Sequence, residues 1–218
     1  MNHLERFLAV MEYKPVDRVV NWEWGAWAHT QQRWISEALD ARSVHWDWIR
    51  GEPLFGFDPP EQISFDTGPL PRYEEKVLAE DDRTVTVRNT QGVVRQSLKE
   101  GSIGAERLSM DHFVDWPVHN MQDLQEHKLR FDPSGVARYE PAWDTIRLPG
   151  WRSRQHPLWL MGAGGTSYGF YWITREWLGT ERVSLAFYDQ PRLIEEIMGF
   201  WADFLIEGAR PILDKTDL

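Results

Sequence analysis

The sequence predicts an α/β protein with parallel strands and an inserted antiparallel hairpin. Residues 157–163, PLWLMGA, form a continuous apolar run, as expected for a strand buried on both faces. Apolar residues recur at helical spacing on both sides of this run. Residues 83–98 alternate between apolar and polar around the turn NTQG, which predicts a hairpin. Because helices separate the buried strands, the expected sheet is parallel.

The first 39 residues predict a helix, a strand and a second helix. Asn2 is a suitable N-cap, and Pro15 ends the first helix. The apolar face of that helix consists of Leu4, Phe7, Leu8 and Met11. The stretch RVVNWEW at 18–24 predicts a strand. Residues 28–39 predict a helix, whose inward face consists of Trp34, Ile35, Ala38 and Leu39.

The next 60 residues change in character. Residues 44–50 predict one or two helical turns, and residues 51–71 are rich in proline and glycine. Within the latter, QISFD at 62–66 is a short apolar strand. Residues 72–98 hold the hairpin, and the surrounding Glu, Asp and Arg residues indicate that one of its faces contacts water.

Helices are expected through most of the second half. Their ranges are 119–130, 139–155 with a break at Pro149-Gly150, 166–178, 181–188 and a last helix from Pro191. The apolar face of the last helix consists of Leu193, Ile194, Ile197, Trp201, Phe204 and Leu205. A complete eight-stranded barrel takes roughly 250 residues. The 218 residues end where another strand is expected, so we expect the N-terminal portion of a larger domain.

Composition narrows the range of partners. The formal net charge of -10 disfavours nucleic acid and anionic membranes as partners. The chain has no cysteine, which excludes disulfides, thiolate zinc sites and cysteine nucleophiles. Together with the lack of a signal peptide and of an apolar run of about 20 residues, this predicts a cytoplasmic protein. The 13 tryptophans are expected mostly in the core, and some in a ligand pocket.

The glycine-rich segment GAGGTSYG at 162–169 joins the buried strand to a helix. Ser167 replaces the third glycine of the dinucleotide pattern, and no Lys-Ser/Thr pair follows, so neither common phosphate-loop pattern is met. The segment is then either a tight turn or a ligand site lined by backbone. For the second case the candidate binding residues are Gly164, Gly165 and Tyr168.

Polar residues at strand ends are the other candidates. Glu23 and Asp66 each interrupt or end an apolar stretch, which is costly unless the carboxylate is solvated, paired or functional. Asn21 and Glu23 share one face of the predicted strand, opposite Trp22 and Trp24. Asn21, Glu23 and Trp24 therefore lie either at an ordinary strand end or at the lip of a binding site. His29 is either a surface residue at a helix start or a part of that site. The alternative is that Glu23 and Asp66 only cap or order loops.

Several chemistries have no motif in this chain. The scattered histidines form no HxH or HExxH pattern, so we expect no metal site within these residues. No GxSxG sequence occurs, so serine-hydrolase chemistry has no support.

Three segments resemble the uroporphyrinogen decarboxylase superfamily. ERFLAVMEYKPVDRVVNWEW at 5–24 is similar to the family's first helix, P-V-D-R turn and first strand. PLWLMGAGGTSYGFYW at 157–172 resembles its strand, glycine turn and helix with a tyrosine. AFYDQPRLIEEIMGFWADFL at 186–205 resembles the next helix, which begins after a D-x-P sequence. The resemblance spans essentially the whole chain.

The resemblance implies a TIM barrel with its cleft at the carboxyl ends of the strands, of which this chain would be the N-terminal half. It also implies that Asn21, Glu23 and Trp24 lie at the mouth of the first barrel strand, where they would help to form a substrate site. It implies that Asp66 is the counterpart of the family's pyrrole-binding aspartate, and Tyr171 that of its tyrosine. Members include uroporphyrinogen decarboxylases and corrinoid-linked methyltransferases. The latter use zinc, which residues beyond 218 would supply, so no cofactor is expected within this chain.

The chain departs from true decarboxylases at two positions. Gly25 and His29 stand where the family has arginines that bind substrate carboxylates. A polyanionic substrate would bind poorly without these cations.

We therefore expect one-carbon or carboxyl-group chemistry on a tetrapyrrole-related or small methylated substrate, and not uroporphyrinogen decarboxylation. In this mechanism Asp66 would stabilise positive charge and Tyr171 would orient the substrate. A corrinoid protein or a second copy of the chain is a possible partner. The alternative is a non-catalytic half-barrel that needs a partner chain or the missing half.

Overall fold

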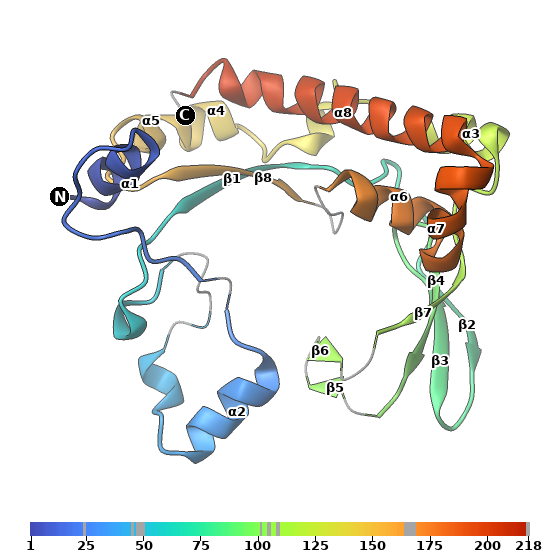
Figure 1. Ribbon diagram of the computed structural model, residues 1–218, viewed down its shortest axis with the longest axis horizontal. Coiled ribbons are helices and arrows are strands. Elements are labelled where there is room, and N and C mark those ends of the chain that lie inside the picture. The colour runs from blue at the N-terminus through green and yellow to red at the C-terminus, as the bar shows by residue number, and fades with distance from the viewer. Residues whose placement is uncertain are drawn as a thin grey trace.

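The computed structural model describes residues 1–23, 25–44, 46, 51–100, 102, 103, 106, 107, 110–163 and 169–216. The protein is a mixed α/β structure with one parallel and two antiparallel sheets among these residues. Figure 1 shows an arch in which α8 (Pro191–Leu213) lies along the top, above the parallel pair β1 (Glu61–Asp66) and β8 (Leu158–Ala163). The helix α2 (Ala28–Ser36) and the larger antiparallel sheet lie at opposite ends below.

The parallel pair and α8 hold the main core. Strands β1 and β8 pair in register from Glu61↔Leu158 to Asp66↔Ala163. Ile63 and Phe65 of β1 are buried with five of the six residues predicted for the inner face of α8, and Leu205 packs against their edge. Phe65 lies so close to α8 that a Cβ at Gly208 would be 2.3 Å from its Cε2 atom. A glycine at this position therefore lets the helix approach the sheet.

Shorter helices complete this layer. They are α3 (Met121–Lys128), α4 (Trp143–Ile146), α5 (Leu148–Arg152), α6 (Phe170–Leu178) and α7 (Thr180–Asp189). From α6, Ile173 and Trp177 enter the core, and from α7, Val183 and Ala186 do so. The predicted helices at 119–130 and 166–178 are confirmed over shorter ranges, and the helix predicted at 181–188 extends over Thr180–Asp189. Residues 164–168 lie outside the described part.

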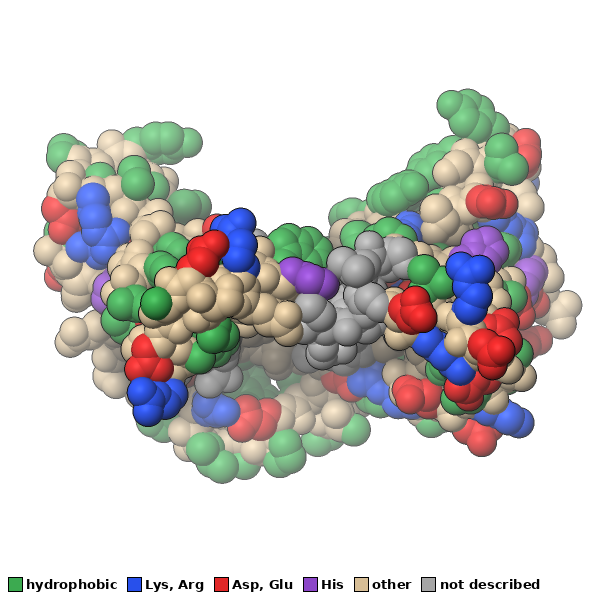
Figure 2. Space-filling model, turned by 90° about the horizontal axis from the view of Figure 1, so that it is seen from below, with side chains coloured by type: hydrophobic (Ala, Val, Ile, Leu, Met, Phe, Trp, Pro, Cys, Tyr) green, Lys and Arg blue, Asp and Glu red, His purple; other side chains and the backbone are tan. Residues whose placement is uncertain are grey.

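The predicted hairpin is confirmed and forms part of a four-stranded antiparallel sheet. Its strands are β3 (Thr84–Arg88) and β4 (Val94–Leu98). The sheet order is β2-β3-β4-β7, where β2 is Lys76–Glu80 and β7 is His112–Asp115. A separate two-stranded sheet consists of β5 (Ser102–Ile103) and β6 (Glu106–Arg107). Seen from below, acidic and basic side chains crowd the end that carries the antiparallel sheet (Figure 2).

The N-terminal segment is fastened by polar contacts around Asp58. The helix α1 (His3–Met11) begins with a capping box between Asn2 and Glu5, as the N-cap prediction requires. The Asp58 carboxylate is 2% exposed and accepts hydrogen bonds from both Nη atoms of Arg18 at 2.7 and 2.6 Å. It also accepts from the backbone N–H of Asn21 and pairs with His3 Nδ1.

A second acidic group completes this N-terminal cluster. Arg6 donates through Nε and Nη2 to the two oxygens of Asp17, at 2.8 and 2.9 Å. Arg6 holds the pKa of Asp17 well below its usual range, and Arg18 does the same for Asp58. Arg6, Asp17 and Arg18 thus hold the start of the chain together.

The strand predicted at 18–24 is not formed in residues 18–23, and Trp24 lies outside the described part. The carbonyl of Asn21 accepts a hydrogen bond from the N–H of Asp58, at 2.8 Å. Residues 18–23 form no β-sheet pairing beyond that bond. The Trp22 ring instead packs between Phe7 and Trp159, at 5.4 and 4.5 Å. The hydrogen bonds to Asp58 and the aromatic packing of Trp22 thus outweigh the strand propensity of residues 18–23.

Two further helix predictions need correction. The helix expected at 28–39 ends at Ser36, and Ala38 follows it with a positive φ of 84°. The helix expected at 139–155 forms as α4 and α5, and it breaks at Arg147 instead of at Pro149-Gly150. Pro149 lies in the first turn of α5, where its missing N–H costs no hydrogen bond. The turns predicted at 44–50 fall mostly outside the described residues.

Among the described residues, no helix combines the length and apolar character that crossing a membrane requires.

Candidate functional site

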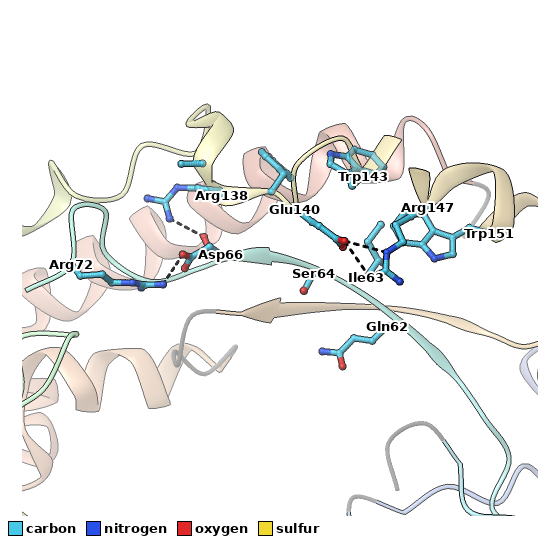
Figure 3. A pocket seen from close by; sticks show the side chains of 12 residues that line it. Gln62, Ile63, Ser64, Asp66, Arg72, Arg138, Glu140, Trp143, Arg147 and Trp151 are labelled. Carbon is cyan, nitrogen blue, oxygen red and sulfur yellow. Dashed lines mark hydrogen bonds and ion pairs between the residues drawn. The ribbon is translucent and has the colours of Figure 1, made fainter. Parts of the chain in front are cut away.

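A cavity of about 330 Å³ lies along β1, between the strand and residues 137–151 (Figure 3). Its lining includes Gln62, Ser64 and Asp66 from β1, Arg72, and the side chains of Arg138, Glu140, Trp143, Arg147 and Trp151. On the edge of β1 opposite β8, an isolated antiparallel bridge joins Phe65 to Tyr139. The cavity therefore combines one apolar aromatic wall with carboxylate and guanidinium groups.

Asp66 is the last residue of β1 and the only predicted catalytic residue that lines this cavity. Its Oδ1 accepts from the N–H of Gly68 at 2.8 Å, and its Oδ2 accepts from Arg72 Nη2 at 2.6 Å. Its register partner is Ala163, the last residue of β8. The carboxyl ends of both parallel strands therefore meet at the edge of the sheet that carries Asp66.

Arg138 holds this end of β1 in place. The residue is buried, and its guanidinium donates to the backbone carbonyls of Asp66, Gly68, Arg130 and Asp132. Its Cζ also lies 4.7 Å from the centre of the Phe204 ring. Burial lowers the pKa of Arg138, while Asp66 and Asp132 oppose that shift. Arg138 thus joins the loop after β1 to the segment after α3 and orients Asp66.

The opposite end of the cavity carries a second acid–base pair. Arg147 donates to Glu140 Oε1 through Nε and Nη2, at 3.3 and 3.2 Å. The rings of Trp143 and Trp151 lie 6.0 Å apart and form the aromatic wall. The indole N–H of Trp151 donates to Glu61 at 2.7 Å, which fixes that wall against β1.

This arrangement suits a small ligand that carries both signs of charge. A carboxylate in the cavity can compete with Asp66 for the forked donors of Arg72. Asp66 would then keep its bond from the Gly68 N–H and could face a positive centre on the same ligand. Trp143 and Trp151 offer apolar surface, and their faces attract a methylated cation.

The other predicted site residues that the structure describes do not line this cavity. Asn21 donates from Nδ2 to the carbonyl of Gly56, while Glu23 and His29 are exposed. Tyr171 lies in the first turn of α6, is 50% exposed and stacks on Phe187. No hydrogen bond, ion pair or ring contact joins Asn21 or Tyr171 to Asp66 within the described part of the chain. Trp24, Gly164, Gly165 and Tyr168 lie outside the described residues.

Four charged cavity residues were not predicted as site residues from the sequence: Arg72, Arg138, Glu140 and Arg147. Arg72 follows Asp66 by six residues, and that short spacing is a signal that could have identified it. The other three come from residues 138–147, about 70 positions further along the chain. Nothing in their local pattern links them to β1.

In the described ranges, no group of three or more His, Asp or Glu side chains is placed to hold a metal ion. Comparisons of the chain with protein-family models, with curated proteins and with solved structures found no match.

Proposed function

We propose that this chain forms part of a (β/α)₈ barrel of the uroporphyrinogen decarboxylase type and acts on a small substrate at the carboxyl edge of β1 and β8. The observation that carries the proposal is the position of Asp66. Its carboxylate ends a strand of the parallel pair, beside the end of β8, and borders a cavity with two acid–base pairs. Ligands of parallel α/β sheets bind at this edge.

The size and charge of the cavity favour a small substrate over a tetrapyrrole. The cavity of about 330 Å³ lies at the low end of the roughly 300–1,000 Å³ typical of small-molecule sites. Gly25 and His29 stand where true decarboxylases have arginines, which removes two cations that a polyanionic macrocycle needs. The proposed substrate is therefore a small methylated carboxylate that undergoes one-carbon or carboxyl-group chemistry.

Each residue has a distinct role in this proposal. Arg72 binds the substrate carboxylate, and Asp66 stabilises positive charge on the substrate. Arg138 is a positioning residue, because it bonds the backbone at Asp66 and not its carboxylate. Tyr171, in the first turn of α6, does not line this cavity and has no role in the proposal. A corrinoid protein or zinc supplied from elsewhere would serve the methyl-transfer form of the reaction.

A binding experiment tests the proposal with glycine betaine, which carries a carboxylate and a methylated cation. Titration should change the tryptophan fluorescence, because Trp143 and Trp151 line the cavity. Asp66→Asn and Arg72→Gln should each weaken binding about tenfold or more, as expected for the loss of a charge-assisted contact. Asp132→Asn is the matched control, since its carboxylate bonds Ser134 outside the cavity.

The proposal fails if glycine betaine does not bind, or if it binds Asp66→Asn and the unchanged protein equally well. Coproporphyrin is the comparison ligand. If it binds more tightly than glycine betaine and depends on Asp66, the tetrapyrrole-related substrate class replaces the small one.

An exposed apolar surface favours the alternative, a non-catalytic half-barrel that needs a partner. Tyr171 of α6 and Leu185, Phe187 and Tyr188 of α7 are all more than 40% exposed. Neighbouring apolar groups of this size mark interaction surfaces in many proteins. Sedimentation velocity of the chain at micromolar concentration tests this alternative. A single monomeric species would remove its support, whereas a dimer that Tyr188→Glu dissociates would favour it.

A further inference from the structure

A second cavity, of about 520 Å³, lies between the antiparallel sheet and the helices α6 and α7. Strand β7 contributes Phe113 and Val114, and Trp116 follows the strand. The helices contribute Arg175 near the end of α6 and Thr180 at the start of α7. None of these residues lines the cavity that contains Asp66.

Arg175 is the central group of this second cavity. Its Nε donates to the hydroxyl of Thr180 at 3.0 Å, and its Cζ lies 4.9 Å from the Phe113 ring centre and 5.2 Å from that of Trp172. These contacts orient the guanidinium on apolar surface. Among the described residues, no acceptor lies within hydrogen-bond distance of its Nη1 or Nη2 atoms. The two nitrogens that form a bidentate fork are therefore available.

Arg95 contacts the same Phe113 ring as Arg175 but has a carboxylate partner. Its guanidinium also lies over the Phe113 ring, at 4.7 Å, but it forms an ion pair with Glu176, whose side chain is largely buried. Arg175 has the same aromatic contact, and the structure pairs it with no carboxylate among the described residues.

Two neighbouring features favour an anion. The indole N–H of Trp116 is buried and has no acceptor among the described residues. Helix α7 begins at this cavity, and its N-cap Gly179 provides no side-chain acceptor for the first N–H groups. The N-terminus of a helix carries partial positive charge.

The aromatic rings of this cavity argue against a cation as the ligand. Two guanidinium groups already lie over Phe113, and the ring of Trp116 stacks on His119 at 5.8 Å. Trp116 also lies against Gly179, where an added Cβ would be 2.3 Å from its Cε3 atom. An aromatic cage for a cation needs free ring faces. Of the two acidic residues that line the cavity, Asp111 accepts from Ser97 and Glu181 lies in the first turn of α7.

We propose that this cavity is a second ligand site, which binds a small carboxylate with an apolar or aromatic body through the guanidinium of Arg175. The carboxylate takes the two free Nη donors of Arg175. The apolar body rests against Val114, Trp116 and the edge of Phe113. Because α6 follows β8 in the chain and β7 is an edge strand, an occupied site would join the antiparallel sheet to the parallel core.

Calorimetric titration with benzoate tests the proposal, with benzamide as the neutral ligand of the same shape. Benzoate should bind, and benzamide should bind about tenfold more weakly or not at all. Arg175→Gln should weaken benzoate binding about tenfold, and Arg175→Lys should give an intermediate loss because it keeps the charge and removes the fork. Arg192→Gln, at an exposed position of α8, is the control for the change in net charge.

Three results would overturn the proposal: no benzoate binding, equal binding of benzoate and benzamide, or full affinity in a folded Arg175→Gln protein. Circular dichroism shows whether each variant is folded, and Arg175→Lys serves if the glutamine variant is not. Arg72→Gln separates the two sites. If that change abolishes benzoate binding and Arg175→Gln does not, the anion binds beside Asp66 and this second site is refuted.

Discussion

The core under α8 and the cluster around Asp58 are held together by different forces. Under α8, large side chains such as Trp201, Phe204 and Phe131 are almost completely buried and contact one another. Around Asp58, charged and polar groups from residues 1–21 meet a single buried carboxylate. Removal of apolar contacts should destabilise the whole molecule, whereas removal of the carboxylate should release mainly the N-terminal segment.

The largest effect is expected in the apolar core. Trp201 is fully buried, so Trp201→Ala should lower the free energy of unfolding by about 3–5 kcal/mol through lost burial and a cavity. Ile206→Ala on the same helix is the control, because Ile206 is 56% exposed and should change stability by less than about 1 kcal/mol. Urea unfolding followed by circular dichroism measures both. Equal effects at the two positions would mean that α8 does not pack as described.

Lowering the pH should reduce the free energy of unfolding of the same core, because His127 is buried there. This side chain is buried between Phe131 and Trp177, and burial lowers its pKa to about 3. In the unfolded chain the imidazole of His127 binds a proton near pH 6.5, so the contribution of the neutral, buried His127 to stability is complete above that pH. It is lost as the pH falls from 6.5 toward 3, by about 1.4 kcal/mol per unit.

His127→Phe tests this pH dependence, since phenylalanine does not titrate. The free energy of unfolding of the variant should vary less between pH 6.5 and 4 than that of the unchanged protein. His119→Phe is the control, because the His119 side chain is about half exposed and lies outside the buried core. Parallel pH profiles for the His127 variant and the unchanged protein would contradict the assignment.

The cluster around Asp58 should respond locally. Asp58→Asn leaves Arg18 and the Asn21 N–H with a weaker acceptor, at a cost of about 1–3 kcal/mol. Hydrogen exchange should speed up in α1 and residues 17–23, with little change in α8. The pKa of Asp58 is held down, so its contribution is present above about pH 4 and is lost as the pH falls further. Exchange that rises equally in both regions would show that they unfold together.

The smallest effect is expected at an exposed ion pair between Lys215, which follows the end of α8, and Asp144 of α4. Lys215 Nζ lies 2.6 Å from Asp144 Oδ2, and both side chains are more than one-third exposed. Lys215→Gln should change the free energy of unfolding by about 0.2–1 kcal/mol, and less in 1 M salt. Thermal unfolding at low and high salt measures this difference. A larger effect, unchanged by salt, would show that the pair supports the packing of α8 on α4.

Local pattern predicted a large part of this fold. The hairpin around NTQG, the strand within 157–163 and the inner face of α8 each follow from a pattern within a short segment, and all are present. The burial predicted for that strand is not complete, because Leu158, Trp159 and Leu160 are partly exposed. The strand expected at 18–24 is absent because its residues bond Asp58, and that partner is distant in the sequence. Asp66 was predicted from its place at a strand end, whereas Arg138 and Arg147 could not be, since their position depends on how residues 138–147 fold against β1.

The sequence by itself determined most of the helical and extended segments, because hydrophobic period, caps and turn residues act over a few positions. It also determined that the chain has no cysteine and a strongly negative net charge. Only the tertiary structure decided which charges meet. It paired Asp66 with Arg72, enclosed Arg138 among backbone carbonyls and left two donors of Arg175 facing a cavity. These outcomes depend on distances between residues far apart in the chain, which packing of the core sets.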